Sequence, residues 1–219
     1  MISGVVVPRR ARAIRFPTGG FGGFPAIAVL TSCLVASPGP RSTLLVEVPE
    51  AEPAVAWARE RFDPSASLGI PAHITVLLPF MPPDVIGPPV LAELERLFAA
   101  VSRFRFQLAG TDWFGEEVLW LAPRDPAPFR ALTSCVYEAF PAFPPFEGVF
   151  DDVVPHLTIG HGHRVSELRA AEESVQAHLP IEADATAVTL MTEQSAGGQW
   201  AKAAVFALAG TAPDRLIIS

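Results

Sequence analysis

The sequence predicts an α+β fold in which antiparallel sheets accompany several helices. Short alternating or β-branched runs, typical of strands, are interleaved with runs of helical period. Several of these strands follow one another with only a turn between them, which favours antiparallel pairing over a regularly alternating parallel sheet. Apolar residues make up 50% of the 219 positions and charged residues 18%. This composition predicts a packed core and excludes a disordered acidic tail, a coiled coil and a histone-like basic protein.

Apolar spacing and proline define the elements expected in the first half of the chain. The β-rich run 42–48 predicts a strand, and residues 53–62, which begin with proline and carry apolar residues near a 3.6 period, predict a helix. Residues 74–80 form an apolar run that predicts a buried strand. The clearest amphipathic pattern, at 88–101, predicts a second helix, and the strict alternation at 104–108 predicts a third strand.

The second half is expected to hold two further helices, a hairpin before them and a closing hairpin. No Gly/Ser-rich or charged linker divides residues 41–208, so we predict a single domain over residues 41–219. The expected elements are a hairpin connection at 110–117, strands at 118–121, 156–159, 185–192 and 199–208, and helices at 126–140 and 165–178.

The first 40 residues differ from the rest. They show no sustained periodicity and contain two glycine pairs and several prolines, so we expect residues 1–40 to form a flexible N-terminal extension. An export signal is the alternative, because a basic start precedes the apolar stretch 24–37, and residues 30–33 resemble a lipoprotein cleavage box ending at Cys33. This stretch is shorter than the ~20 apolar residues of a membrane span. The two cysteines, Cys33 and Cys135, form no disulfide framework or metal motif, so we expect a cytoplasmic protein.

The net charge of −7 is unevenly distributed. Five arginines are the only charged residues among the first 46 positions, so the remainder of the chain carries −12. A folded part this acidic repels polyanions at long range, which argues against extended binding of RNA or DNA. A phosphate ligand would have to be held by a few aimed donors.

A His-x-Thr triplet occurs twice, each time at the start of an apolar run that follows a proline. The two copies are His73-Ile74-Thr75 and His156-Leu157-Thr158, 83 residues apart. Residues i and i+2 of a strand share a face, so each strand would present an imidazole beside a hydroxyl. If two similar lobes bring these strands together, the result is a cleft floored by two histidines and two threonines. A hydrogen-bonded structural role is the alternative for either histidine alone, and the repetition of the pair favours function.

Such a floor suits the cleavage of a phosphodiester without a metal ion. One imidazole can take a proton from water while the other gives a proton to the departing oxygen, and each role is typically worth ~10²–10⁴ in rate. Threonine hydroxyls can donate hydrogen bonds to the non-bridging phosphate oxygens. We therefore expect His73 and His156 to be catalytic, Thr75 and Thr158 to bind substrate, and no metal or other cofactor to be required.

These features resemble the 2H phosphoesterases, a family that includes the bacterial 2′–5′ RNA ligase and cyclic phosphodiesterase enzymes and is defined by two His-x-Thr/Ser motifs. The resemblance extends to Phe80 after the first motif, to the strand Val118-Leu119-Trp120-Leu121, and to the closing hairpin with Trp200. It covers about residues 42–208. The resemblance implies two pseudo-symmetric lobes of mostly antiparallel sheet, with flanking helices around a central cleft.

The resemblance also implies an activity and a substrate class. It implies hydrolysis of 2′,3′-cyclic phosphate ends of RNA, or of nucleotide cyclic phosphates, with His156 as the base and His73 as the acid. The expected partner is a nucleotide or an RNA end, and the protein is expected to be a monomer. Family members often carry a basic residue after the second motif where this chain has His161. A neutral imidazole holds phosphate less firmly than arginine, so we predict hydrolysis and make no prediction of ligation.

A binding module without catalysis is one alternative. Trp113, Phe114 and Phe80 could stack a base, as aromatic platforms do for single strands. Turnover distinguishes the two hypotheses, because a pure binder would leave a cyclic-phosphate nucleotide intact.

A metal-binding protein is the other alternative, since His156, His161 and His163 lie close together in the sequence and imidazole is a common metal ligand. Strand parity counts against this hypothesis. It places His156 on one face and the other two histidines on the opposite face, unless Gly160 forms a bulge.

Overall fold

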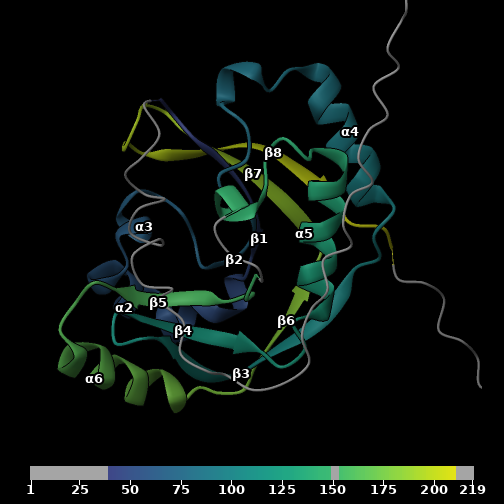
Figure 1. Cartoon of the computed structure of the whole chain (residues 1–219). Helices are drawn as coiled ribbons and strands as arrows, with labels where there is room; N and C mark the ends of the chain where they lie inside the picture. Colours follow the sequence, from purple (N-terminus) through teal and green to yellow (C-terminus); the bar gives the residue numbers. More distant parts are fainter. Residues whose placement is uncertain (1–38, 149–152, 211–219) are drawn as a thin grey trace, which may run out of the picture.

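The structure of the protein, a computed structural model, describes residues 39–148 and 153–210 (Figure 1). The predictions of a flexible extension over residues 1–40 and of an export signal ending at Cys33 therefore lie outside the described residues, apart from positions 39 and 40. Among the helices of the described ranges, none is long and apolar enough to cross a membrane.

Two four-stranded antiparallel sheets form the frame of the molecule (Figure 1). The first sheet has the order β2-β1-β7-β8 and the second has the order β5-β4-β3-β6. The strands of the first sheet are β1 (Ser42–Glu47), β2 (His73–Leu77), β7 (Ala187–Glu193) and β8 (Trp200–Ala207). Those of the second are β3 (Phe104–Phe114), β4 (Val118–Pro123), β5 (Leu157–His161) and β6 (Ile181–Ala185). The predicted two-lobed α+β fold with antiparallel sheets is confirmed.

Four helices of eleven to thirteen residues accompany the sheets: α2 (Glu52–Phe62), α4 (Pro88–Ala99), α5 (Ala127–Ala139) and α6 (Val165–Gln176). Proline occupies the first turn of α2, α4 and α5, where its fixed φ suits a helix and its missing N–H costs nothing. In Figure 1, α4 and α5 lie at one side of the molecule and α2 and α6 at the other. The described chain also contains the short helix α3 (Pro64–Ser67) and the 3₁₀ turns η1 (Pro49–Ala51), η2 (Pro83–Val85) and η3 (Pro145–Gly148).

Two elements of the second sheet differ from the sequence prediction. The expected hairpin connection at 110–117 is wrong, because β3 continues to Phe114 and only residues 115–117 turn, with Gly115 at a φ of 60°. Strand β6 was not predicted. Two of its inward-facing residues are alanines, which have a low strand propensity. The segment is a strand because it pairs with β3.

A strand–helix–strand unit occurs twice, as β1-α2-β2 and as β4-α5-β5. The last strand of each unit lies at an edge of its sheet, and these two edge strands, β2 and β5, lie side by side. The helices are exchanged between the units: α2 packs against β5 and α5 packs against β2. Thr133 of α5 fixes the second contact, because its hydroxyl donates a hydrogen bond to the carbonyl of Val76 over 2.8 Å.

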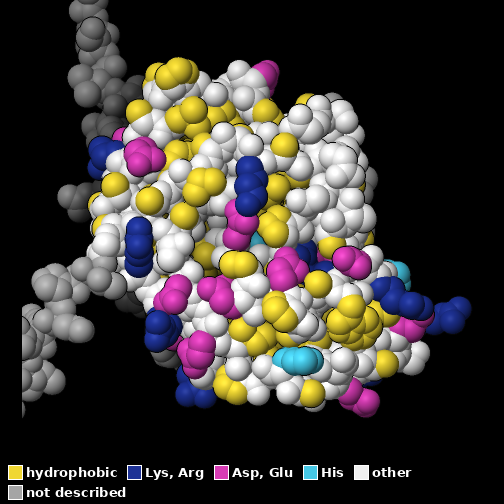
Figure 2. Space-filling view, turned by 180° about the vertical axis from the view of Figure 1, so that it is seen from behind, with side chains coloured by type: hydrophobic (Ala, Val, Ile, Leu, Met, Phe, Trp, Pro, Cys, Tyr) yellow, Lys and Arg dark blue, Asp and Glu magenta, His cyan; other side chains and the backbone are white. Residues whose placement is uncertain are grey.

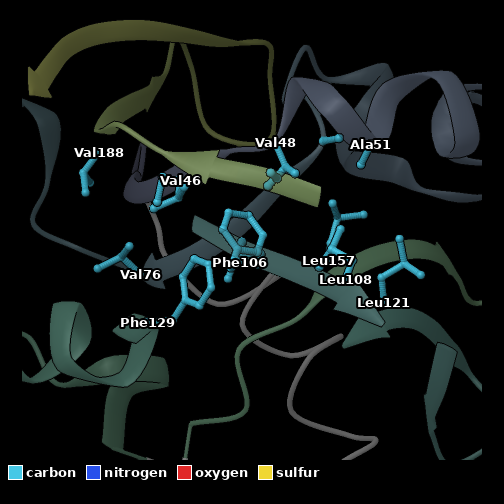
Figure 3. Close-up of a cluster of buried hydrophobic side chains, with 14 of the residues drawn as sticks. Val46, Val48, Ala51, Val76, Phe106, Leu108, Leu121, Phe129, Leu157 and Val188 are labelled. Carbon is cyan, nitrogen blue, oxygen red and sulfur yellow. The ribbon is translucent and has the colours of Figure 1, made fainter. Parts of the chain in front are cut away.

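The main core is a continuous cluster to which both sheets and all four long helices contribute, and a smaller separate cluster is formed by Leu45, Ile70, Met191 and Trp200. Figure 3 shows part of it: side chains of the first sheet pack against those of the second, beside Phe129 of α5. The labelled strand residues are Val46, Val76, Val188, Phe106, Leu108, Leu121 and Leu157, and Val48 directly follows β1. Strand side chains alternate, so the side chains next to these residues point to the opposite face of each sheet, away from the core. We call this opposite face the motif face.

Candidate active site

The two His-x-Thr triplets lie at the adjacent edges of the sheets. His73 and Thr75 belong to β2, Thr158 belongs to β5, and His156 directly precedes β5. All four side chains are half-buried. Their apolar neighbours Ile74, Val76, Leu157 and Ile159 are buried in the core. The alternation expected from the sequence is therefore present in both strands, and the four polar side chains lie on the motif face.

Both imidazoles are held by the backbone in the same way. Nδ1 of His73 lies 2.7 Å from the carbonyl oxygen of Pro71, and Nδ1 of His156 lies 2.7 Å from that of Val154. A carbonyl oxygen can only accept, so Nδ1 carries the hydrogen in each neutral ring and Nε2 is the basic nitrogen. No described residue forms a hydrogen bond to Nε2 of either ring. Each ring therefore keeps one nitrogen available for a ligand.

The electrostatic surroundings favour neutral rings. Burial lowers the pKa of His73 to about 4, with a further lowering from the guanidinium of Arg59, while the carboxylate of Asp63 opposes both effects. Burial also lowers the pKa of His156, against the opposing influence of its backbone hydrogen bond and of Asp63. A proton on His156 is a smaller contribution to the lowered pKa of His73. Both imidazoles are therefore mainly neutral at pH 7 in the free protein.

The threonine hydroxyls are not used by the fold. Among the described residues, neither Thr75 Oγ1 nor Thr158 Oγ1 has a hydrogen-bond partner. The hydroxyl of Thr133, by contrast, donates hydrogen bonds to the backbone carbonyls of Val76 and Phe129. Thr75 and Thr158 can therefore donate to a ligand on the motif face.

Aromatic rings enclose His156. Phe114 stacks on Trp120 with ring centroids 4.8 Å apart, and both rings meet the imidazole edge-on, at 5.0 and 5.7 Å. Trp120 pairs with Thr158 across β4 and β5, which places both on the motif face. From the sequence, Trp120 stood out only through the family resemblance. Its place beside His156 depends on the register between β4 and β5, which the strand pattern alone does not give.

Of the three aromatic residues considered for base stacking, only Phe114 contacts a motif histidine. Trp113 lies on the other face of β3, where its Nε1 donates to Glu172 of α6 over 3.0 Å and Arg169 covers its ring. Phe80 is buried against Phe140, with ring centroids 5.3 Å apart.

A β-bulge changes the position of His161. Trp120 pairs with Thr158, but the preceding Leu119 pairs with Gly160, so β5 contains one extra residue. A Cβ at Gly160 would lie 2.6 Å from Leu168 Cδ2 and 2.8 Å from Phe62 Cβ, which explains the glycine.

Beyond the bulge, His161 pairs with Val118 and lies on the same face as Thr158. The parity argument that separated His161 from His156 is therefore wrong. His163 is exposed and packs edge-on against Phe62 at 5.1 Å. In the described parts of the chain, no three His, Cys, Asp or Glu side chains are grouped so that they could hold a metal ion.

One cation beside the motifs was missed in the sequence analysis. Glu47 pairs directly with His73 across β1 and β2. Its carboxylate accepts hydrogen bonds from Thr189 Oγ1 at 2.8 Å and from Lys202 Nζ at 2.7 Å. Lys202, the only lysine of the sequence, follows His73 by more than a hundred residues, and its ion pair with Glu47 connects it to the strand neighbour of His73. Figure 2 shows a hollow near the middle of one face, with part of a histidine visible in it and charged side chains around it.

Comparison with known proteins agrees with this arrangement. A family model described as the 2′-5′ RNA ligase superfamily matches residues 47–197. Among solved structures, Escherichia coli LigT, crystallised with 3′-AMP, is 16% identical with a TM-score of 0.52, and the match covers 78% of this chain and 98% of LigT. TT0787 of Thermus thermophilus is 20% identical with a TM-score of 0.51, covering 78% and 100% of the two chains. No curated protein sequence matches the chain.

At these identities the two solved structures show a shared fold. The family match spans well over half of the chain and includes both His-x-Thr strands. It confirms the resemblance to the 2H phosphoesterases that the paired motifs predicted. The chain belongs to the 2′–5′ RNA ligase superfamily.

Proposed function

We propose that this protein hydrolyses 2′,3′-cyclic phosphate ends of RNA, or nucleotide cyclic phosphates, by acid–base catalysis with His73 and His156. One observation carries the proposal. The two motifs lie on adjacent edge strands, and each imidazole donates Nδ1–H to its own backbone carbonyl and keeps Nε2 for a ligand. Two unused threonine hydroxyls on the same face supply donors for the phosphate oxygens.

The reaction balances with these four side chains. One neutral imidazole takes a proton from a water molecule through Nε2 while the water oxygen forms a bond to phosphorus. The bond between phosphorus and one ribose oxygen breaks, and the protonated imidazole gives its Nε2 proton to that oxygen. Thr75 and Thr158 donate hydrogen bonds to the non-bridging oxygens, on which charge grows in the transition state. Each ring ends in the protonation state with which the other began, and exchange with solvent restores the starting form.

The surroundings of the site support a nucleotide or an RNA end as substrate. The net charge of −12 beyond residue 46 disfavours long polyanions, whereas Lys202 and the half-buried hydroxyls supply local donors for one phosphate. The stacked pair of Phe114 and Trp120 offers an apolar wall next to His156. LigT, which shares the fold, was crystallised with 3′-AMP, a phosphorylated nucleotide. We also propose that the protein is a monomer. The number of cysteines supports a reducing, cytoplasmic compartment.

The direct test offers the purified protein a short RNA that ends in a 2′,3′-cyclic phosphate, with EDTA present throughout. We expect the ring to be opened to a phosphomonoester, which a shift in gel mobility or mass spectrometry detects. If the protein binds the RNA end and leaves it intact, it is a binding module. If EDTA abolishes the turnover and added zinc or nickel restores it, a metal ion takes part and the proposed mechanism fails.

The pH dependence of kcat/KM gives a second test. The pKa of His73 is lowered to about 4 and the pKa of His156 is lowered from its ordinary value of 6.5, so the interval in which the pair holds a single proton lies below pH 6.5. Above this interval both rings are neutral and no acid is present, whereas below it both rings are protonated and no base is present. We expect kcat/KM, measured from initial rates, to peak within the interval and to fall about tenfold per pH unit on its alkaline side.

A maximum well above pH 6.5 would contradict this description of the free protein. The resemblance implies that His73 is the acid and His156 the base, and that order stays a prediction.

A further inference from the structure

An arginine from a helix binds the chain just before the first motif. Arg59 of α2 donates from Nη2 to the carbonyl oxygen of Ile70 over 3.1 Å. The next carbonyl, that of Pro71, accepts the hydrogen bond from His73 Nδ1. Arg59 is only 2% exposed, so this contact is sheltered from water. Arg59 therefore binds the same backbone segment that in turn binds the imidazole of His73.

The same connection recurs before the second motif. Arg130 of α5 donates from Nε to the carbonyl oxygen of Val153 over 3.2 Å. The next carbonyl, that of Val154, accepts the hydrogen bond from His156 Nδ1. Each arginine thus binds the carbonyl three residues before its histidine, and each comes from the helix of the same strand–helix–strand unit.

The first unit carries a further contact that the second does not need. Glu52, at the start of α2, accepts a hydrogen bond from the N–H of Ala72 over 2.7 Å. The residue at the corresponding position before His156 is Pro155, which has no N–H to satisfy. Arg59 and Glu52 therefore hold the peptide units on both sides of Pro71, and the lack of a Glu52-like contact in the second unit is consistent with the proline at position 155.

Arg59 is itself fixed by an acidic partner. Its Nε and Nη2 donate to Asp63 Oδ2 over 3.1 and 3.0 Å, and the other oxygen of that carboxylate accepts from the N–H of Ser65 at the start of α3. Asp63 is 6% exposed. A guanidinium held by a carboxylate on one side can present its remaining N–H group in a fixed direction. This geometry suits an orienting contact to the Ile70 carbonyl.

We propose that Arg59 and Arg130 are positioning residues, one for each imidazole, which hold the backbone before each motif so that Nδ1–H stays on its carbonyl and Nε2 stays on the motif face. The orienting role is a property of the fold. Only its effect on turnover rests on the proposed function. Neither arginine touches the reacting atoms, so each acts solely through its own histidine.

The test measures the imidazole nitrogens directly by NMR of protein with ¹⁵N-labelled histidine. The sequence has five histidines, and the His73→Ala and His156→Ala variants assign the two signals of interest. The wild type is expected to show the Nδ1–H form for both rings. In Arg59→Lys, which keeps the charge beside Asp63, the His73 signals should move toward a mixture of the two neutral forms while those of His156 stay unchanged. In Arg130→Met the reverse is expected.

Kinetics on the cyclic-phosphate RNA complete the test. Loss of the outer hydrogen-bond partner of a metal-bound histidine costs about 10–100-fold, and by analogy we expect kcat to fall by about tenfold in each variant, with a smaller effect on KM. Arg61→Met removes an exposed arginine from the same helix and should leave both signals and kcat unchanged. If Arg59→Lys does not fold, Arg59→Met/Asp63→Asn removes the ion pair without stranding a buried charge.

The proposal is overturned if both histidines keep their Nδ1–H signals in both arginine variants, or if each variant moves both histidines together. The second pattern would mean general loosening of the fold. If the wild type does not open the cyclic phosphate but each arginine still controls its own imidazole, the proposed function fails and the positioning role stands.

Discussion

Replacing His73 or His156 by alanine is expected to lower kcat on a 2′,3′-cyclic phosphate RNA at least ~10²-fold, because each variant removes one proton-transfer step. The double variant should be little worse than the poorer single variant, since two groups that act in one step are not additive. Initial rates under saturating substrate measure the effect. The melting temperature should change little, because both rings are half-buried and each makes a single hydrogen bond to the backbone.

A matched control is available in His178, an exposed histidine after α6. His178→Ala should retain the wild-type rate. Full activity in either His73→Ala or His156→Ala would end the two-histidine mechanism. A loss in one variant only would leave one histidine as catalyst and the other as a structural residue.

The valine variants of Thr75 and Thr158 are expected to show the next largest effect. Valine matches the shape of threonine and removes only the hydroxyl, which has no partner among the described residues of the fold. Loss of a donor to a developing oxyanion typically costs ~10²–10³ in kcat, and we expect each valine variant to fall near the lower end of that range because two donors share the phosphate. Single-turnover rates and KM values separate this effect from weaker binding.

Serine provides the control at the same positions. Thr75→Ser and Thr158→Ser keep the hydroxyl and should recover most of the rate. If the valine variants are fully active, the threonines are ordinary strand residues. If serine fails as badly as valine, the methyl group and not the hydroxyl is what the site requires.

Local patterns predicted much of this molecule. Helices α2, α4 and α5 each have a proline in the first turn, followed by apolar residues at helical spacing. The proline and the apolar pattern lie within a few residues of each other along the chain. The placement of His73 and Thr75 on one face follows from alternation along a single strand, and the repeat at His156 predicted a second such strand. These inferences hold because the physics that determines them is confined to one segment of chain.

Features that depend on a neighbouring strand or helix were missed. His161 shares the face of Thr158 only because β5 gains a residue relative to β4, and a bulge has no reliable sequence signal beyond a glycine. Lys202 is linked to His73 only through Glu47, its ion-pair partner and the strand neighbour of His73. Arg59 and Arg130 look like ordinary helix residues until their carbonyl partners are known. In each case the information lies in the pairing of distant segments, which periodicity along one segment does not contain.

The exchange of α2 and α5 between the repeated units has a consequence for how substrates are admitted. The two units are arranged like the subunits of a helix-swapped dimer joined in one polypeptide, because the helix of each unit packs against the last strand of the other. Separating the two units would expose the apolar faces of both helices, so we expect the fold to resist a change in the distance between the two motif strands. For the proposed reaction, we therefore expect selection among substrates to depend on how well a molecule fits this distance, and not on closure of the two units around it.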